Sequence, residues 1–180
     1  MKKKDDRELV AMITCNLEKG FRILMEEYKE AVYWHIRRLV VHHENAQDAT
    51  QETFVRIFRS LPKFKSECSL RSWIYRIATN EALRSLTRHK RDWLSLDDIS
   101  TELNNMAADE YMDYNDLEVV KLQKAILSLP TKQQLVFNLR YYNELEYDEI
   151  AAIVNSTTDS AKSNYHIAKE KIIKYMNLNY

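Results

Sequence analysis

The chain has 180 residues, of which 45% are hydrophobic and 30% charged, and its 27 basic and 27 acidic side chains give a formal net charge of zero. That length accommodates one medium domain or two small ones, and that hydrophobic content suffices for a packed core, which excludes a globally disordered chain. A single glycine and two prolines argue against β-hairpins and glycine-rich phosphate loops, so the composition predicts an all-helical protein.

The N-terminal residues and the cysteines exclude further classes. The opening stretch, MKKKDDRELVAMI, lacks the apolar run and cleavage site of a signal peptide. No apolar stretch is long enough to cross a membrane, so we expect a cytoplasmic protein. Cys15 and Cys68 stand apart from each other and from any histidine pair at ligand spacing, which predicts reduced thiols and no metal site.

Charge is distributed unevenly along the chain. Residues 1–91 carry 19 basic and 12 acidic side chains, a net charge of +7. Residues 92–120 carry nine acidic and no basic side chains, and residues 121–180 carry eight basic and six acidic ones. A basic, an acidic and a mildly basic segment in series predict two nucleic-acid-facing domains and a connector.

Two helices are predicted in the first third of the chain. Apolar residues recur at helical spacing over residues 21–40, which predicts one long helix. Asn45 is expected to be the N-cap of a second helix, which carries Phe58 on its inward face and ends at Pro62. Its outward residues at four-residue spacing, Asp48 and Glu52 among them, suit either local ion pairing or an acidic docking surface for a protein.

A third helix is expected after a loop that contains an aromatic residue. Ser69 is its predicted cap, and Trp73 belongs to its apolar, inward stripe. Its other face is basic, and the loop before it carries Phe64 between two lysines. A basic groove beside an aromatic loop suits single-stranded DNA, because it neutralises the backbone and receives an unstacked base. The competing interpretation is the charged face of an ordinary helical bundle.

The helical pattern breaks and then resumes. Residues 92–116 are acidic and aperiodic, and we expect a flexible linker there. Thr131 and Gln134 have the spacing of a capping box that opens a later helix. A short helix over residues 147–154 is followed by a turn in which Asn155 suits the left-handed conformation.

The last third of the chain has the pattern of a helix-turn-helix, whose second helix lies in the DNA major groove. Its sequence over residues 145–175 is LEYDEIAAIVNSTTDSAKSNYHIAKEKIIKY. The alternative for the final helix is a solvated amphipathic helix that binds nothing. The polar and basic groups of its outer face, which suit base edges and phosphates, are Thr158, Ser160, Lys162, Ser163, Asn164, His166 and Lys169.

Three stretches in series carry a resemblance to a known family. They are NAQDATQETFVRIFRSLPKF, SLRSWIYRIATNEALRSLTRHKR, and LSLPTKQQLVFNLRYYNELEYDEIAAIVNSTTDSAKSNYHIAKEKI. In this order they resemble the extracytoplasmic-function (ECF) sigma factors of bacterial RNA polymerase, within the sigma-70 family. The resemblance implies an all-α fold with sigma region 2 at residues 1–91, an acidic linker at 92–116, and a helix-turn-helix region 4 at 117–180.

The resemblance also implies a function and its partners. A sigma factor binds core RNA polymerase, directs it to promoters and helps to melt the minus-ten region; it has no catalytic activity, no cofactor and no small-molecule substrate. The implied partners are the clamp coiled coil and the flap of core RNA polymerase, promoter DNA, and, as a candidate, a membrane-bound anti-sigma factor.

Residue roles follow from the resemblance position by position. The implied polymerase-docking residues are Asp48, Gln51, Glu52 and Phe54. The residues implied to contact minus-ten DNA are Phe64, Lys65, Ser66, Ser69, Arg76, Asn80, Arg84 and Arg88. The polar and basic groups on the outer face of the final helix are implied to read the minus-thirty-five element. Asn164 and Ile167 stand where the family often has arginine, which indicates weaker phosphate contacts or a different promoter preference. Asp159 stands where the family often has glycine and would repel phosphate, and Ser156 stands where the family often has an apolar residue.

Two other functions compete with this interpretation. A stand-alone helix-turn-helix regulator of duplex operator DNA explains the C-terminal third, but it leaves the upstream basic helix and the acidic surface around Asp48 without a role. An enzyme is disfavoured because the sequence has no phosphate loop, no HExxH motif and no nucleophile paired with a base.

Overall fold

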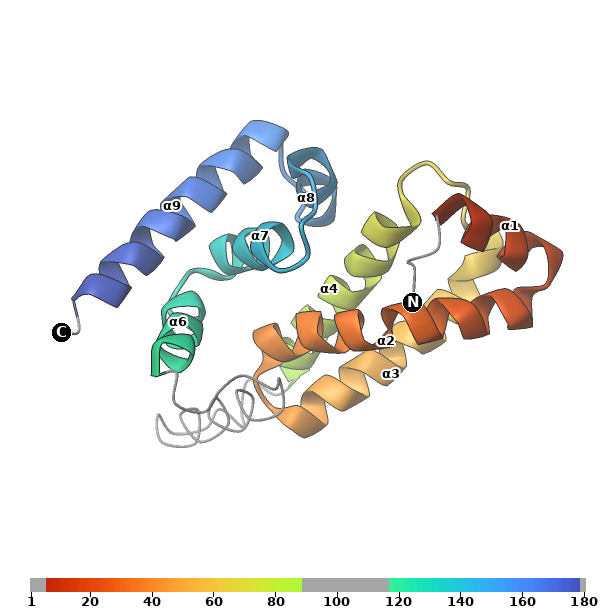
Figure 1. Ribbon diagram of the computed structural model, residues 1–180, viewed down its shortest axis with the longest axis horizontal. Helices are drawn as coiled ribbons and strands as arrows, with labels where there is room; N and C mark the ends of the chain where they lie inside the picture. Colours follow the sequence, from red (N-terminus) through yellow and green to blue (C-terminus); the bar gives the residue numbers. More distant parts are fainter. Residues whose placement is uncertain (1–5, 89–116, 179–180) are drawn as a thin grey trace.

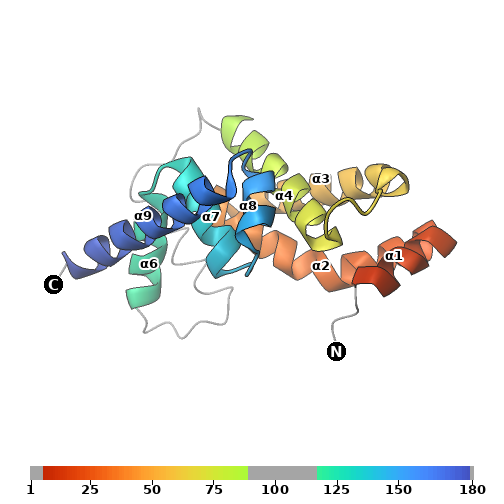
Figure 2. The same ribbon diagram turned by 90° about the horizontal axis from the view of Figure 1, so that it is seen from above.

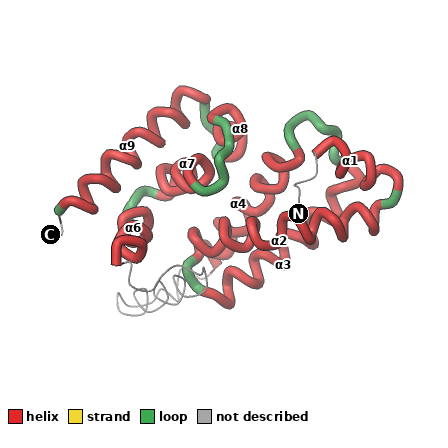
Figure 3. Tube along the Cα trace, viewed as in Figure 1, coloured by secondary structure: helices red, strands yellow, loops and turns green. Residues whose placement is uncertain are grey.

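A computed structural model describes residues 6–88 and 117–178, and within these ranges all regular secondary structure is helical (Figure 1, Figure 3). The predicted linker, residues 92–116, lies outside the described residues. The N-terminal helices are α1 (Asp6–Cys15), α2 (Leu17–Val40), α3 (His43–Ser60), the 3-10 turn η1 (Leu61–Lys63) and α4 (Leu70–Arg88). The C-terminal helices are α6 (Leu117–Leu127), α7 (Thr131–Tyr141), α8 (Tyr147–Ile153) and α9 (Thr158–Asn177). The all-helical prediction is therefore confirmed.

The N-terminal bundle packs α3 and α4 against the long helix α2, and α1 folds back along the start of α2. The sequence patterns did not predict α1. Gly20 makes its close approach possible, because a Cβ at this position would lie 2.6 Å from the Cα of Ile13. Tyr28 donates a hydrogen bond to Asp6 of α1 at 3.1 Å, and burial together with this carboxylate raises the pKa of Tyr28.

The predicted helix caps have mixed outcomes. Ser69 caps α4 as expected, because its Oγ accepts a hydrogen bond from the backbone N–H of Ser72 at 3.1 Å. Asn45 is not a cap, since α3 already begins at His43 and its N-cap is His42. That early start places Asn45 inside the first turn, where its side chain cannot cap the helix.

The predicted capping box at Thr131 is also wrong. Pro130 is the N-cap of α7 and Thr131 is already helical, with no side-chain cap. A capping box forms instead at α8, between Glu146 and Glu149. Glutamate replaces the usual serine or threonine at the N-cap, so the S/T-x-x-E/Q pattern does not reveal this helix start.

The C-terminal bundle centres on α9, which contacts α6, α7 and α8. Ala161 and Ala168 are fully buried on its inward stripe, so the neighbouring helices approach it closely. Asn155 in the turn between α8 and α9 has a φ of 50°, which confirms its predicted left-handed conformation. The helix-turn-helix is therefore present as α8, turn and α9.

The two bundles lie directly against each other. Helix α8 contacts α4, and α7 contacts α2; Figure 1 and Figure 2 both place α8 beside α4. In the described ranges, no helix combines the length and the apolar character that crossing a membrane requires.

Candidate functional site

Helix α3 presents an exposed polar face on the surface of the N-terminal bundle. Asp48, Gln51 and Glu52 are exposed, whereas Phe54, also implied in docking, is 7% exposed and belongs to the core. The first three can therefore meet a partner directly, and Phe54, although nearly buried, lines the groove between α2 and α3.

The local ion pairing considered for α3 does not form within the described residues. The Nε of Arg56 lies 2.6 Å from Oε1 of Glu81 on α4, across the bundle. Arg84 binds the same carboxylate oxygen at 2.8 Å. Asp48 and Glu52 make no ion pair with any residue of 6–88 or 117–178. Their charges are thus available to a partner, which favours the docking interpretation of this face.

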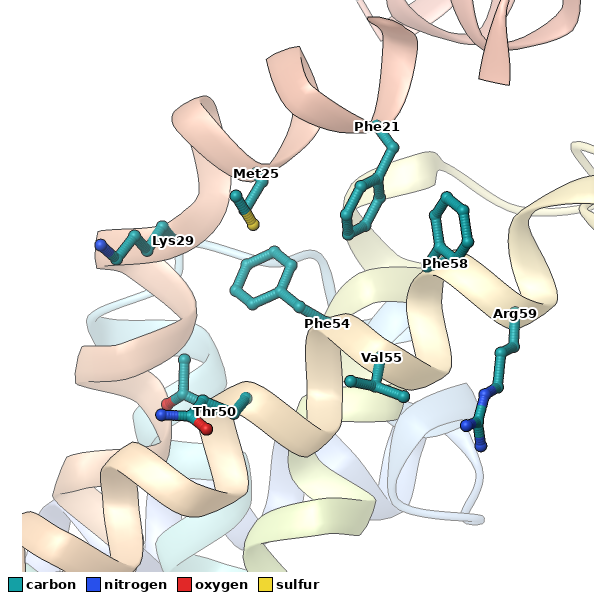
Figure 4. A pocket seen from close by; sticks show the side chains of 9 residues that line it. Phe21, Met25, Lys29, Thr50, Phe54, Val55, Phe58 and Arg59 are labelled. Carbon is teal, nitrogen blue, oxygen red and sulfur yellow. The ribbon is translucent and has the colours of Figure 1, made fainter. Parts of the chain in front are cut away.

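An apolar groove runs beside the exposed face, between α2 and α3 (Figure 4). It has a volume of about 810 Å³. In this groove Met25, Val55 and Phe58 are 37%, 42% and 39% exposed. The rings of Phe21 and Phe58 pack edge to face, with their centroids 4.9 Å apart. The groove is lined by Phe21, Met25, Lys29, Thr50, Gln51, Phe54, Val55, Phe58 and Arg59. A contiguous exposed apolar patch with a polar border is typical of a protein-binding surface.

Most of these apolar groove residues were not among the predicted site residues. Phe58 was expected to face inward and is instead exposed, which corrects that expectation. The sequence signal that could have revealed the groove is the width of the apolar face of α3. Phe54, Val55 and Phe58 together cover a wider arc of the helix than packing against the core alone requires. The exposed face of α3 that carries Asp48 and Glu52 is its acidic face. Gln51 joins the groove to this acidic face, because it lines the groove and lies one turn from Asp48.

The loop before α4 holds its aromatic residue against the bundle. Phe64 is half-buried and packs on Trp73, with ring centroids 5.0 Å apart. Lys65, Ser66 and Ser69 are exposed, and Ser66 has a φ of 55°. The left-handed residue turns the chain sharply at the loop tip, so Lys65 and Ser66 face outward while the aromatic ring supports the loop. The hydroxyl of Ser69 instead donates to Oε1 of Glu149 on α8 at 2.5 Å.

The outward face of α4 carries the predicted basic residues. Arg76, Asn80, Arg84 and Arg88 are all exposed, and the last three border a shallow depression together with Leu83 and Thr87. The buried carboxylate of Glu81 restrains Arg84. The face is thus suited to an anionic backbone.

Helix α9 exposes only part of its predicted recognition face. Lys162, Ser163, His166 and Lys169 are exposed, whereas Thr158, Ser160 and Asn164 are half-buried. Asn164 donates to the backbone carbonyl of Ser160 at 2.7 Å, and the backbone N–H of Ser160 donates to Oγ1 of the N-cap Thr157 at 3.2 Å. The side chain of Asn164 is thus engaged within the first turns of α9, and the exposed groups of the predicted face are Lys162, Ser163, His166 and Lys169.

His35 occupies a buried position where α2, α4 and the C-terminal bundle meet. Its Nδ1 is 3.0 Å from Oδ1 of Asn143 and its Nε2 is 2.9 Å from Oγ1 of Thr79. One neutral tautomer satisfies both contacts, donating to Asn143 and accepting from Thr79. Burial lowers the pKa of His35 from 6.5 to about 4.

This low pKa predicts acid sensitivity of the fold. The unfolded chain binds the His35 proton more tightly than the folded protein, so stability is full above pH 6.5 and falls as the pH drops toward 4. We expect a loss of about 3 kcal/mol in the free energy of unfolding across this range. Urea unfolding at a series of pH values measures it. His35→Gln should flatten the slope and His166→Gln, at an exposed histidine, should not; equal slopes in all three proteins would contradict the assignment.

Comparisons with known proteins bear on both bundles. The family description "Sigma-70 region 2" matches residues 24–92, and "Sigma-70, region 4" matches residues 120–172. The ECF RNA polymerase sigma factor SigW of Bacillus subtilis is 27% identical, over 88% of this chain and 90% of that protein. The ECF RNA polymerase sigma-E factor of Escherichia coli K12 is 28% identical, over 93% and 92% respectively.

Two solved structures share the fold. CnrH, in complex with the cytosolic domain of CnrY, superposes with a TM-score of 0.72 at 19% identity, covering 97% of this chain and 99% of that one. The sigma factor RpoE of Bartonella quintana, in complex with the anti-sigma factor NepR, gives a TM-score of 0.70 at 18% identity, covering 90% and 99%.

Two helical bundles that match sigma-70 regions 2 and 4 in this order define a non-enzymatic transcription initiation factor. The chain belongs to the sigma-70 family and, within it, to the ECF sigma factors. It binds core RNA polymerase and directs it to promoters. A stand-alone helix-turn-helix regulator is set aside, because the match includes region 2 as well as the helix-turn-helix.

Proposed function

We propose that each function of this sigma factor has its own surface. Region 2, residues 1–91, docks on the clamp coiled coil through the acidic face and groove of α3, and it captures the melted minus-ten strand on α4 and the loop before it. Residues 92–116 connect it to region 4, residues 117–180, which reads the minus-thirty-five element with α9 and contacts the flap. The cytoplasm, where polymerase and promoters meet, is the proposed location.

One observation carries the docking assignment: the groove between α2 and α3 is apolar and exposed, and it adjoins carboxylates that have no partner among the described residues. An apolar centre with a charged border combines hydrophobic gain with electrostatic steering. Gln51 lies at the junction of the two parts, so one partner helix laid along α3 can use both.

The minus-ten assignment rests on the exposed row of α4. Arg76, Asn80, Arg84 and Arg88 recur at intervals of four residues, so they lie along one side of the helix. The amide of Asn80 is suited to a hydrogen bond with a base edge, and the guanidinium groups on either side of it are suited to backbone phosphates. Phe64 offers a ring beside this row, on a loop that Trp73 supports.

An anti-sigma factor is a proposed partner as well. Both solved neighbours were determined in complexes, CnrH with the cytosolic domain of CnrY and RpoE with the anti-sigma factor NepR. In this chain the groove offers what an amphipathic helix of an antagonist needs, an apolar trough of about 810 Å³. A membrane-bound antagonist that occupied it would compete directly with polymerase.

Region 4 provides a test with a quantitative readout. Replacing Lys162 with alanine should weaken holoenzyme binding to a promoter duplex and lower the salt dependence by about one unit of slope, because one phosphate contact is lost. Binding is measured by fluorescence anisotropy over a salt series. Lys174→Ala removes an exposed lysine in the last turn of the same helix and should leave the slope unchanged. A slope unaltered in Lys162→Ala would show that this side chain contacts no phosphate.

A further inference from the structure

Glu81 of α4 is a buried carboxylate that two arginines from different helices share. Its side chain is 6% exposed. Oε1 of Glu81 lies 2.6 Å from Nε of Arg56 on α3 and 2.8 Å from Nη1 of Arg84 on α4. A buried carboxylate is costly unless it is paired, and here two cations compensate one oxygen. The three side chains form an ion-pair triad that joins the docking helix α3 to the DNA-facing helix α4.

The triad holds one arginine of the row that is proposed to contact the minus-ten strand. Arg84 borders the shallow depression on α4 together with Asn80 and Arg88. Of the three arginines in the row, Arg84 is the one with an ion pair in the part of the chain that the structure describes. Its side chain is still 54% exposed, and a guanidinium has five N–H donors. Donors that do not face Glu81 are therefore open to a phosphate.

Arg56 braces the carboxylate from the opposite helix. A carboxylate bound only by Arg84 could move with that side chain, because both belong to the same helix. The bond from Nε of Arg56 ties Oε1 of Glu81 to α3 as well, and α3 packs along α4. Glu81 thus has a fixed position from which it can orient Arg84.

Glu81 has two opposing effects on an anionic strand, and their sizes decide the net result. A long side chain that is already ordered avoids an entropy loss on binding, which is worth about fivefold in affinity. The carboxylate also repels a phosphate bound on the far side of the guanidinium, but at a separation of about 7 Å in water and salt this costs less than about twofold. Orientation is the larger effect, so Glu81 should favour strand binding by about threefold.

We propose that Glu81 is a positioning residue for strand capture: braced by Arg56, it holds Arg84 where the backbone of the melted minus-ten strand passes. This inference rests on the proposed minus-ten role of Arg84. Because Glu81 is buried, it acts on the strand through Arg84 and not by touching DNA itself.

The affinity of the holoenzyme for a single strand tests this role. Saturating core polymerase keeps every variant in the holoenzyme, and anisotropy reports binding of a labelled strand carrying the minus-ten element of a promoter that the holoenzyme transcribes. Glu81→Gln keeps the side-chain shape and removes the charge, and it should weaken binding about threefold. Glu30→Gln removes the same charge from an exposed position on α2 and should match the parent. Unchanged or tighter binding in Glu81→Gln would overturn the inference.

A double-mutant cycle distinguishes orientation of Arg84 from a general effect on the fold. Arg84→Ala should lower strand affinity and reduce the salt dependence by about 0.7 units of slope, the value for one phosphate contact on a single strand. In the Arg84→Ala background, Glu81→Gln should cause no further loss, because the side chain it orients is absent. An equal loss in both backgrounds would mean that Glu81 acts through the fold, and the inference would be wrong.

The same measurements separate this inference from the minus-ten assignment. If Arg84→Ala weakens strand binding and Glu81→Gln does not, the minus-ten role of Arg84 stands and only its orientation by Glu81 is refuted. If Arg84→Ala changes neither the affinity nor the salt slope, the minus-ten role of Arg84 is wrong, and the inference falls with it.

Glu81→Asp provides a second variant in case Glu81→Gln fails to fold, which circular dichroism detects. It keeps the negative charge but withdraws the carboxylate by one methylene, so the contacts with Arg56 and Arg84 cannot both be kept. Strand affinity should again fall about threefold, because the position of the carboxylate matters and not its charge alone. Full affinity in Glu81→Asp would contradict the inference.

Discussion

Reversing two charges on α3, Asp48→Arg together with Glu52→Arg, should reduce the affinity for core RNA polymerase on the order of 100-fold. Both side chains are exposed and make no ion pair within the described ranges, so the fold should not depend on them. The loss is expected because two attractive contacts become repulsive, and like charges brought together at an interface cost several kcal/mol. Affinity is measured by titrating fluorescently labelled sigma factor with core enzyme.

A matched pair controls for net charge. Glu30→Arg with Glu170→Arg makes the same change in charge at exposed positions outside the acidic face, and it should leave core affinity within about threefold, since surface charges away from an interface contribute little. Unchanged affinity in the Asp48 and Glu52 variant, or an equal loss in both variants, would refute the docking assignment.

Placing a charge in the groove should have a similarly large effect. Val55 is 42% exposed, so Val55→Asp is expected to change the free energy of unfolding by no more than about 1 kcal/mol. In a complex the new carboxylate would be buried in an apolar contact without a partner, which should weaken core binding by about 100-fold. Competition with labelled wild-type protein for core enzyme measures the loss.

The control for this substitution is Leu178→Asp. Leu178 is 69% exposed just beyond the end of α9, and a charge there should alter neither stability nor core binding. If Val55→Asp binds core enzyme normally, the groove is not part of the docking surface, and the acidic face of α3 acts alone.

Local patterns in the sequence predicted the helices well. The apolar stripes of α2, α4 and α9 are regular over many turns, and the Ser69 cap and the Asn155 turn depend only on near neighbours in the chain. The Asn45 and Thr131 caps failed for a related reason. Several residues near the start of a helix have side chains that could cap it. Which residue begins the helix depends on how the whole helix packs, and not on one side chain.

The contact between the bundles could not be predicted in this way. His35 and Asn143 are 108 positions apart, and neither has a local pattern that indicates a partner. The exposed groove could not be predicted from the sequence either, because an aromatic residue such as Phe58 is equally compatible with an inward stripe and with a binding surface. Which of the two it joins depends on how many helices cover that side of α3, which is a property of the tertiary structure.

The most direct test of sigma-factor function and of the docking face on α3 is run-off transcription with purified core RNA polymerase and a library of genomic promoter fragments. We expect specific transcripts only when this protein is added, and their loss with the Asp48→Arg, Glu52→Arg variant. No transcript with the wild-type protein, together with no co-elution with core polymerase, would contradict it.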